Sequence, residues 1–292
     1  MANLKEIRTR ITSVNNTRKI TSAMKMVAAA KLRKAQSAIT QMRPYAQKLQ
    51  DIMDHVMSSK EALEDNVYSD ERKINRVLVV VIASNKGLCG AFNANSVKKA
   101  IELIQNEYSD LFEQGLVDIY TVGKKANDLL RSRKIPIKDS FENIYNDLNF
   151  KTVSELAQKI MDRFEDKEYD KVHIVYNQFK NAAVQKLTVE HFLPISIENK
   201  EEEAASGDYI YEPDKEQITE QLIPYALKIQ LYKAVLDSNA SEQGARMTAM
   251  HKATDNATDL LRDLKLTYNK ARQAAITNEI LEIVGGAEAL QN

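Results

Sequence analysis

The chain is poor in the residues that cross-link a fold or interrupt helices. It has a single cysteine, Cys89, among 292 residues, so it cannot form an internal disulfide, and this usage suits a reducing compartment. Tryptophan is absent, and there are only 8 glycines and 5 prolines. Such a scarcity of helix-breaking residues is typical of a helix-rich chain.

Long apolar runs are missing as well. No stretch approaches the ~20 apolar residues that are needed to span a bilayer. The N-terminus lacks the apolar segment of a secretory signal, and a transit peptide is not expected because a regular apolar pattern begins at Leu4. We therefore expect any link to a membrane to be indirect.

Acidic residues are nearly absent from the first 50 positions, although the whole chain is neutral, with 41 Lys and Arg against 41 Asp and Glu. Glu6 is the only acid there. The basic residues of this segment are Lys5, Arg8, Arg10, Arg18, Lys19, Lys25, Lys31, Arg33, Lys34, Arg43 and Lys48. We expect the N-terminal segment to meet an acidic partner.

Apolar residues recur in steps of three and four over the first 56 positions, which is the heptad pattern of a coiled coil. Arg18, Thr21 and Lys25 fill the seam between its two apolar parts. Pro44 is expected to kink the helix locally at most. The apolar seam positions are Leu4, Ile7, Ile11, Val14, Ala28, Leu32, Ala35, Ile39, Met42, Ala46, Leu49, Met53 and Val56. This pattern predicts a coiled-coil helix within residues 1–60.

A second heptad pattern occupies the C-terminal part, and we predict a coiled-coil helix over residues 214–286 that pairs antiparallel with the first. Pro224 indicates either the first turn of this helix or a kink near its start. Gly285 and Gly286 predict its C-terminal end. The seam positions are Tyr232, Leu236, Met250, Ala253, Ala257, Leu260, Leu264, Thr267, Ala271, Ala274, Asn278 and Leu281.

The lengths of these helices argue against an ordinary bundle. About 55 residues of helix span roughly 80 Å, whereas a compact globule of this chain length has a diameter of about 50 Å. At least one helix end is therefore expected to protrude. The alternative is a helical bundle whose helices are broken at Pro44 and Gly244, but bundle helices are usually far shorter.

Between the helices, short β-branched runs alternate with helical patterns. This alternation predicts a central α/β, Rossmann-like domain over residues 75–200 with a largely parallel sheet. The expected strands are Arg76–Ser84, Val117–Gly123, Lys171–Phe179 and Val184–Ile195, the last two forming a hairpin, and the expected helices are Asn95–Tyr108, a stretch that ends at Arg133, and Val153–Phe164.

The central domain offers few candidates for chemistry. The loop Ser84–Gly90 follows the first strand, but its glycines match neither phosphate-binding motif, so we interpret them as a tight turn. Cys89, in an apolar neighbourhood, is expected to be a buried thiol. The histidines His55, His173, His191 and His251 lack the spacing of a zinc site, and we interpret Glu201–Glu203 as part of a solvated loop. Because no nucleophile, base and orienting group come together, we predict no catalytic, cofactor-binding or metal-binding residue.

Several segments together are similar to one family. They are "IRTRITSVNNTRKITSAMKMVAAAKLRKAQ" near the start, "SNKGLCGAFN" after the first strand, "YIYEPD" before the last helix, and "ASEQGARMTAMHKATDNA" followed by "YNKARQAAITNEILEIVGGAEAL" at the end. These segments resemble the gamma subunit of F-type ATP synthase. The resemblance covers nearly the whole chain and is least diagnostic at about residues 110–170.

The resemblance implies a non-catalytic rotor shaft. In this family the paired terminal helices stand inside a ring of alternating alpha and beta subunits, and rotation of the shaft changes the nucleotide affinities of the beta subunits in turn. Arg272, Gln273 and Thr277 match positions that contact the catch loop of a beta subunit. Met24 and Lys25 match the region near its acidic lever segment.

The resemblance also implies a foot that meets the membrane ring. Tyr211 and Glu212 match positions that contact the polar loops of the proton-carrying c-ring, and the epsilon subunit is a further partner. The protein would then be peripheral, attached to the membrane only through the c-ring. Without a transit peptide, we expect a bacterial source and the cytoplasmic face of the inner membrane.

Two other classes of function remain open from the residues alone. One is an α/β small-molecule enzyme with a coiled-coil dimerisation arm, against which stands the lack of a catalytic constellation. The other is a nucleic-acid-binding arm, because a long basic helix can follow phosphates, although no recognition motif or interleaved aromatic residues support it.

Overall fold

The computed structural model describes residues 4–57, 67–70, 72–195 and 215–291. They form two compact units, one made of residues 1–28 and 247–292 and the other of residues 29–246. The helices α1 (Leu4–Met57) and α7 (Lys215–Gln291) contribute to both units. The predicted fold class, an α/β domain with two long terminal helices, is confirmed; the exact domain boundaries given above stay predictions.

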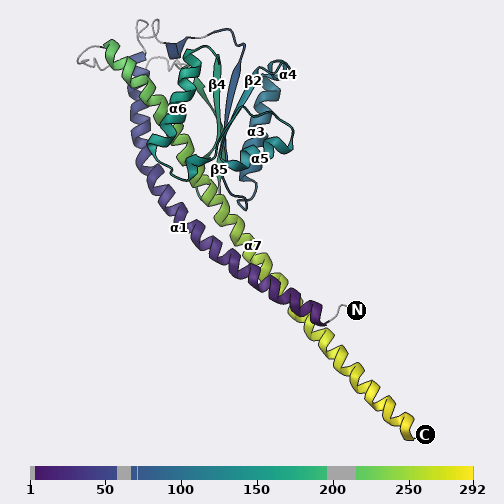
Figure 1. Cartoon of the computed structure of the whole chain (residues 1–292). Helices are drawn as coiled ribbons and strands as arrows, with labels where there is room; N and C mark the ends of the chain where they lie inside the picture. Colours follow the sequence, from purple (N-terminus) through teal and green to yellow (C-terminus); the bar gives the residue numbers. More distant parts are fainter. Residues whose placement is uncertain (1–3, 58–66, 71, 196–214, 292) are drawn as a thin grey trace. The chain divides into compact units, whose positions relative to one another are not determined.

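A five-stranded sheet forms the centre of the larger unit (Figure 1), in the order β3-β2-β1-β4-β5. β1 pairs in parallel with β2 and β4, β2 pairs in parallel with β3, and β5 runs antiparallel to β4. The strands are β1 (Val77–Ile82), β2 (Val117–Val122), β3 (Asp139–Phe141), β4 (Lys171–Phe179) and β5 (Gln185–Leu193). All four predicted strands and the hairpin are confirmed, and β3 is an addition.

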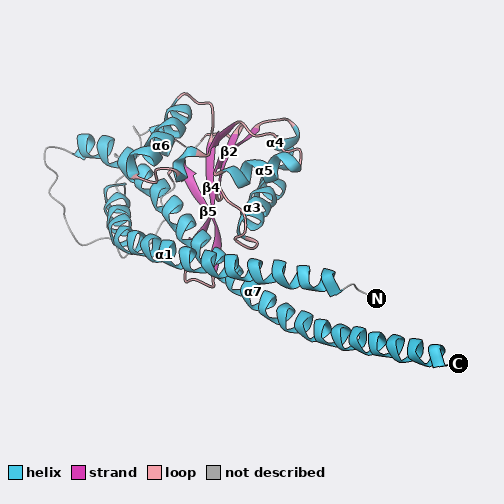
Figure 2. Cartoon of the chain, turned by 60° about the horizontal axis from the view of Figure 1, so that its bottom comes forward, coloured by secondary structure: helices cyan, strands magenta, loops and turns pink. Residues whose placement is uncertain are grey.

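Both faces of this sheet are covered by helices (Figure 2). The helices and turns of the central region are η1 (Val67–Ser69), α3 (Phe92–Glu107), α4 (Ser109–Glu113), α5 (Lys124–Ser132), η2 (Asn143–Tyr145) and α6 (Phe150–Glu165). α3 and α5 pack with Val77, Val79 and Val81 on one face, while α6 and part of α7 pack with the alternate residues of β1 on the other. Because β1 is buried on both sides, it is a continuous apolar run.

Local sequence explains where the central helices begin. The side chain of Asn149 accepts a hydrogen bond from the Thr152 main-chain N–H at 2.9 Å, which caps α6. Gly123 precedes α5 with a φ of +96°, a conformation that glycine adopts without strain. These two residues fix the starts of helices whose apolar faces lie on opposite sides of the sheet.

In the larger unit, the two long helices continue through every predicted break. Pro44 lies inside α1 and Pro224 lies inside α7, so the expectation that Pro224 marks the first turn is wrong and the kink alternative remains. Gly244 is also helical, and it faces the main chain of Ala182 in the β4–β5 turn. The alternative of a bundle broken at Pro44 and Gly244 is therefore wrong, because both residues lie within continuous helix.

In the smaller unit, the two helices run antiparallel. The Thr254 hydroxyl donates to the Thr21 hydroxyl at 2.9 Å, and Ile7, Ala28 and Ala257 are buried in the seam. The predicted seam holds as far as Ala257 on α7, after which the predicted seam residue Leu260 is exposed.

The departures from the predicted C-terminal pattern have simple causes. Leu261 is buried where Leu260 was expected, because an α-helix has 3.6 residues per turn and drifts against a strict heptad. The expected end at Gly285 and Gly286 is wrong, since α7 continues to Gln291. Glycine permits the left-handed conformation that ends many helices but does not impose it.

Candidate functional site

The end of α7 extends beyond its partner helix. Counting equally in both directions from the Thr21–Thr254 pair, Leu4 of α1 falls opposite Ala271 of α7. Ala271 is half-buried, and every residue from 272 to 287 is exposed. In Figure 1 this last part of α7, in yellow, continues past the start of α1. The smaller unit thus presents a single helix without a described neighbour.

This unpaired segment exposes large apolar side chains. The exposed residues are Ile276, Ile280, Leu281, Ile283 and Val284, and Ile283 has an exposed fraction of 67%. Scattered exposed apolar residues are ordinary, but a contiguous set of this kind marks a partner-binding surface. The sequence prediction missed this surface because it assigned Leu281 to the coiled-coil seam.

The three residues that the resemblance assigns to a beta-subunit contact lie on this segment. Arg272, Gln273 and Thr277 are exposed, and none of their side chains has a hydrogen-bond or ion-pair partner within the described ranges. Gln273 and Thr277 are four residues apart and share a face of the helix. Arg272 shares a face instead with the exposed Ile276, so a charged donor stands beside an apolar anchor.

Met24 and Lys25 belong to a second exposed region of the smaller unit. Both are half-buried, and they precede Met26 and Val27, which have exposed fractions of 65% and 56%. On the register given above, Lys25 falls opposite Met250, roughly 30 Å along the helix from Arg272. The structure therefore separates the two predicted contact regions, and Met26 and Val27 were missed because they lie off the heptad seam.

In the larger unit, the carboxyl ends of the parallel strands are occupied by the chain itself. The guanidinium of Arg246 on α7 donates to the carbonyls of Lys86 and Gly87, in the loop after β1, and to Glu242. Arg246 and Glu242 are almost completely buried. In open α/β folds this edge of the sheet is where ligands usually bind; here an arginine fills it.

The Ser84–Gly90 loop is closed by its own polar groups. Asn93 accepts from the Ser84 main-chain N–H at 2.9 Å, and its amide donates to the Cys89 sulfur at 3.2 Å. Cys89 is buried, as predicted, and burial raises the pKa of its thiol. The loop turns carbonyls rather than N–H groups toward Arg246, which is consistent with the tight turn inferred from the sequence and not with a phosphate cradle.

A second arginine binds at the end of β4. Arg43 of α1 donates to Asp237 of α7 at 2.7 Å and also to the Phe179 carbonyl. Burial raises the pKa of Asp237, and the hydrogen bond and charge of Arg43 oppose that rise. The sequence contains no local signal for this contact, because its partners are distant along the chain.

In the described part of the chain, no histidine belongs to a cluster of side chains that could hold a metal ion. His173 is buried in β4, and its Nε2 lies 2.8 Å from the Tyr108 hydroxyl. Burial, with smaller effects of His191 and Lys171, lowers the pKa of His173 to about 3. His173 is thus a core residue, although its Nδ1 has no hydrogen-bond partner among the described residues.

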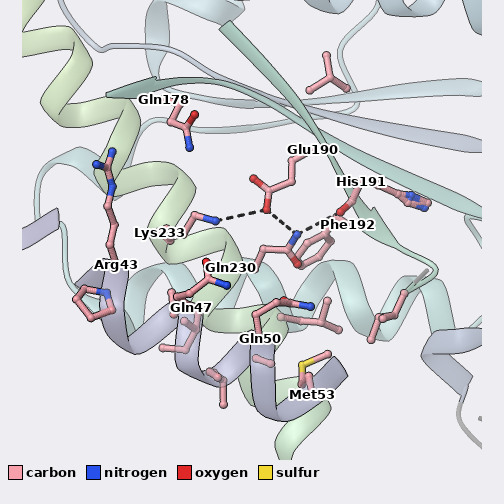
Figure 3. A pocket seen from close by; sticks show the side chains of 18 of the residues that line it. Arg43, Gln47, Gln50, Met53, Gln178, Glu190, His191, Phe192, Gln230 and Lys233 are labelled. Atoms are coloured by element: carbon pink, nitrogen blue, oxygen red, sulfur yellow. Dashed lines mark hydrogen bonds and ion pairs between the residues drawn. The ribbon is translucent and has the colours of Figure 1, made fainter. Parts of the chain in front are cut away.

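An open groove of about 930 Å³ lies in the larger unit between α1, β5 and α7 (Figure 3). Glu190 accepts a hydrogen bond from the Gln230 amide at 2.8 Å and pairs with Lys233 at 3.8 Å. Met53 and Phe192 add apolar side chains to its lining, and Phe192 lies beside Gln230 (Figure 3). The polar side chains of the lining, Glu190, Gln230 and Lys233, therefore pair with one another. The described lining does not bring a nucleophile together with a base.

Two further observations concern membranes and the predicted foot. Within the described ranges, no helix is long and apolar enough to cross a membrane. Tyr211 and Glu212, the predicted c-ring contacts, lie outside the described residues. Their assignment stays a prediction.

Comparison with known proteins identifies the family. A family model described as ATP synthase matches residues 3–290. The ATP synthase gamma chain of Flavobacterium johnsoniae is 55% identical over 290 residues, covering 99% of each chain. The chain therefore belongs to the gamma-chain family of ATP synthases, whose members are non-catalytic subunits.

Solved structures agree with this assignment. A chain of the mitochondrial ATP synthase central stalk and c-ring of Tetrahymena thermophila is 29% identical, with a TM-score of 0.63 over 80% of this chain and 99% of that one. A chain from a Euglena gracilis mitochondrial ATP synthase, solved with OSCP, F1 and c-ring, is 25% identical, with a TM-score of 0.68 over 98% and 94%. The family and fold inferred from the sequence resemblance are thus confirmed.

Proposed function

We propose that the chain is the central rotor shaft of a proton-translocating F-type ATP synthase. It transmits the rotation of a c-ring to catalytic beta subunits, whose conformations change in sequence, and it makes or breaks no bond in ATP itself. The proposal is supported by the full-length similarity to gamma chains and to chains from central-stalk and F1 assemblies.

The single observation that carries this proposal is the unpaired end of α7. A lone helix is only marginally stable in water, and this one exposes Ile276, Ile280 and Leu281 along with Arg272. Such a helix requires neighbours that cover it from outside. A hexameric head of alpha and beta subunits, with the helix along its axis, provides them.

Within that head, we assign two contact regions to the beta subunits. Arg272 offers a planar fork that binds a carboxylate through two hydrogen bonds, and Gln273 and Thr277 add neutral donors for a catch loop. Met24 and Lys25 face the acidic lever segment. The separation of the two regions along the shaft lets one rotation act on two parts of a beta subunit.

A different part of the chain is assigned to the membrane ring. We assign Tyr211 and Glu212 to the contact with the c-ring, and the epsilon subunit to the α/β domain. The protein is then peripheral, at the cytoplasmic face of a bacterial inner membrane, and is held to the membrane only through the c-ring. No nucleic acid takes part.

Purification of an affinity-tagged chain from membranes of its own source tests the proposal. Alpha, beta and epsilon subunits and the c-ring should co-purify in a complex that hydrolyses ATP, while the isolated chain shows no turnover. Turnover by the isolated chain would support the enzyme alternative. Salt-sensitive binding to duplex DNA, without co-purified subunits, would support the nucleic-acid alternative.

A further inference from the structure

We propose that Arg43 and Asp237 form a clamp that transmits torque between the α/β sheet and the two long helices. The inference rests on the proposed rotor function and adds positioning residues to it. One Arg43 nitrogen, Nη2, donates both to Asp237 Oδ1, at 2.7 Å, and to the carbonyl of Phe179, the last residue of β4. A single guanidinium thus joins α1, α7 and the sheet.

The buried side of this clamp is held through one carboxylate oxygen, Asp237 Oδ1, while Oδ2 has no hydrogen-bond partner among the described residues. The Asp237 side chain has an exposed fraction of 0%, against 42% for Arg43. Asp237 Oδ1 also accepts from the Phe179 main-chain N–H at 3.3 Å. A buried carboxylate is stable only when its partners are well placed, so the three groups hold one another in a single geometry.

The position of the clamp along the chain gives it a mechanical role. The covalent connections from α1 to β1 and from β5 to α7 are residues 58–76 and 194–214. The end of β4 is far from both in sequence, so any load that passes there between sheet and helices is transmitted by non-covalent contacts. Farther along α7, the Ser241 hydroxyl donates to the Asn177 carbonyl at 2.9 Å, but this bond joins α7 alone to the sheet, whereas Arg43 adds α1.

Stability alone does not explain a charge pair at this place. Apolar residues of similar volume often replace a buried ion pair without loss of stability. Apolar contacts, however, are non-directional, so they resist sliding and twisting less than hydrogen bonds of defined geometry do. A rotor that transmits torque through packed elements gains stiffness from directional bonds.

The experiment measures torsional stiffness in the assembled synthase. The head is fixed to a surface and stalled, and a bead is attached to a cysteine introduced by Lys98→Cys on α3, where the lysine side chain is 71% exposed. The buried Cys89 does not compete for the label. The width of the angular distribution of the bead is compared for the parent, Arg43→Ala, Arg43→Lys and the control Lys48→Ala, which removes an exposed cation of the same helix.

We expect a loss of stiffness, seen as a wider distribution, for Arg43→Ala, a partial loss for Arg43→Lys, and the parental width for Lys48→Ala. An assembled Arg43→Ala complex with the parental width overturns the clamp, even if its melting temperature is lower. If Arg43→Ala does not assemble, Asp237→Leu is measured, because it keeps a similar volume and removes the oxygen that accepts from Arg43 and Phe179; widening supports the clamp and parental width overturns it. A parent complex in which the bead never rotates on adding ATP contradicts the proposed function instead.

Discussion

Gly123 lies so close to Ala83 that no side chain fits between them. A Cβ atom on Gly123 would be 2.3 Å from the Ala83 carbonyl oxygen, and the φ of Gly123 is +96°. The Ala83 carbonyl and the φ of Gly123 both belong to the main chain, so no side-chain rotation can relieve either of them. Gly123→Ala is therefore expected to reduce the free energy of unfolding by about 3 kcal/mol or more, since strain and overpacking add.

Two other glycines are matched controls for this prediction, measured by urea unfolding of the isolated chain. Gly115 has a φ of +72° but open space around it, and Gly87 has open space and no positive φ. Gly115→Ala should reduce the free energy of unfolding by about 1–2 kcal/mol, because only the backbone conformation is strained there. Gly87→Ala should leave the free energy of unfolding almost unchanged. Equal losses at Gly123 and Gly115 would contradict the steric argument.

Arg272→Ala should slow ATP hydrolysis by assembled complexes. A charge-assisted hydrogen bond is worth about 1.5–3 kcal/mol, and in a rate-limiting step this corresponds to roughly 10- to 150-fold. Arg272→Lys should recover only part of the rate, because a point charge cannot reproduce the fork. The control is Lys270→Ala, another exposed cation of the same helix. If Arg272→Ala assembles normally and retains nearly the parental rate, the catch-loop contact is wrong.

The apolar end of α7 should matter for assembly and not for the isolated chain. Ile280 and Ile283 are exposed, so Ile280→Ser with Ile283→Ser removes no described internal contact and should leave the thermal melting of the isolated chain unchanged. Reconstitution with alpha and beta subunits should become weaker, because apolar area is no longer buried there. The outcome that contradicts this is a fall in melting temperature with unimpaired reconstitution.

Acid should destabilise the larger unit through His173. Its folded pKa, about 3, lies below the ordinary value of 6.5, so the unfolded chain binds the proton more tightly. Its contribution to stability is full above pH 6.5 and is lost as the pH falls from 6.5 toward 3, with a slope of at most about 1.4 kcal/mol per pH unit. His173→Gln should flatten the dependence of melting temperature on pH, and the exposed His251→Gln should not. If His173→Gln keeps the parental dependence of melting temperature on pH, His173 is not the cause of the acid sensitivity.

Tyr211 and Glu212 test the foot of the rotor separately from the shaft. Replacing both with alanine should weaken proton-coupled ATP synthesis in membrane vesicles while leaving hydrolysis by the detached soluble head nearly intact. The reason is that the head does not need the c-ring to hydrolyse ATP. Equal losses in the two assays would mean that these residues act elsewhere.

The sequence predicts most clearly what repeats along the chain. Ile7, Ala28 and Leu32 are buried as the heptad pattern requires, because a helix that buries one face must repeat its apolar residues. The pattern fails at Leu260, where the drift between helix and heptad accumulates. It also fails beyond Ala271, because a seam exists only where a partner helix runs alongside.

Contacts between distant segments were not predictable in the same way. Asp237 lies outside the predicted seam, and its partners Arg43 and Phe179 lie on other elements. Only the folded chain brings them together. The short strand β3 was missed for a related reason, since "DSF" at Asp139–Phe141 has no apolar run and is a strand only because β2 lies beside it.

The change from two helices to one at Ala271 has a consequence for symmetry. A single helix presents a new side chain about every 100° around its axis and has no rotational repeat of its own. Three identical neighbours placed around it therefore meet three different surfaces at any moment: one meets Arg272 and Ile276, while the others meet different side chains. If the three neighbours are the beta subunits of the proposed head, the difference in their surroundings follows from the covalent structure of this chain.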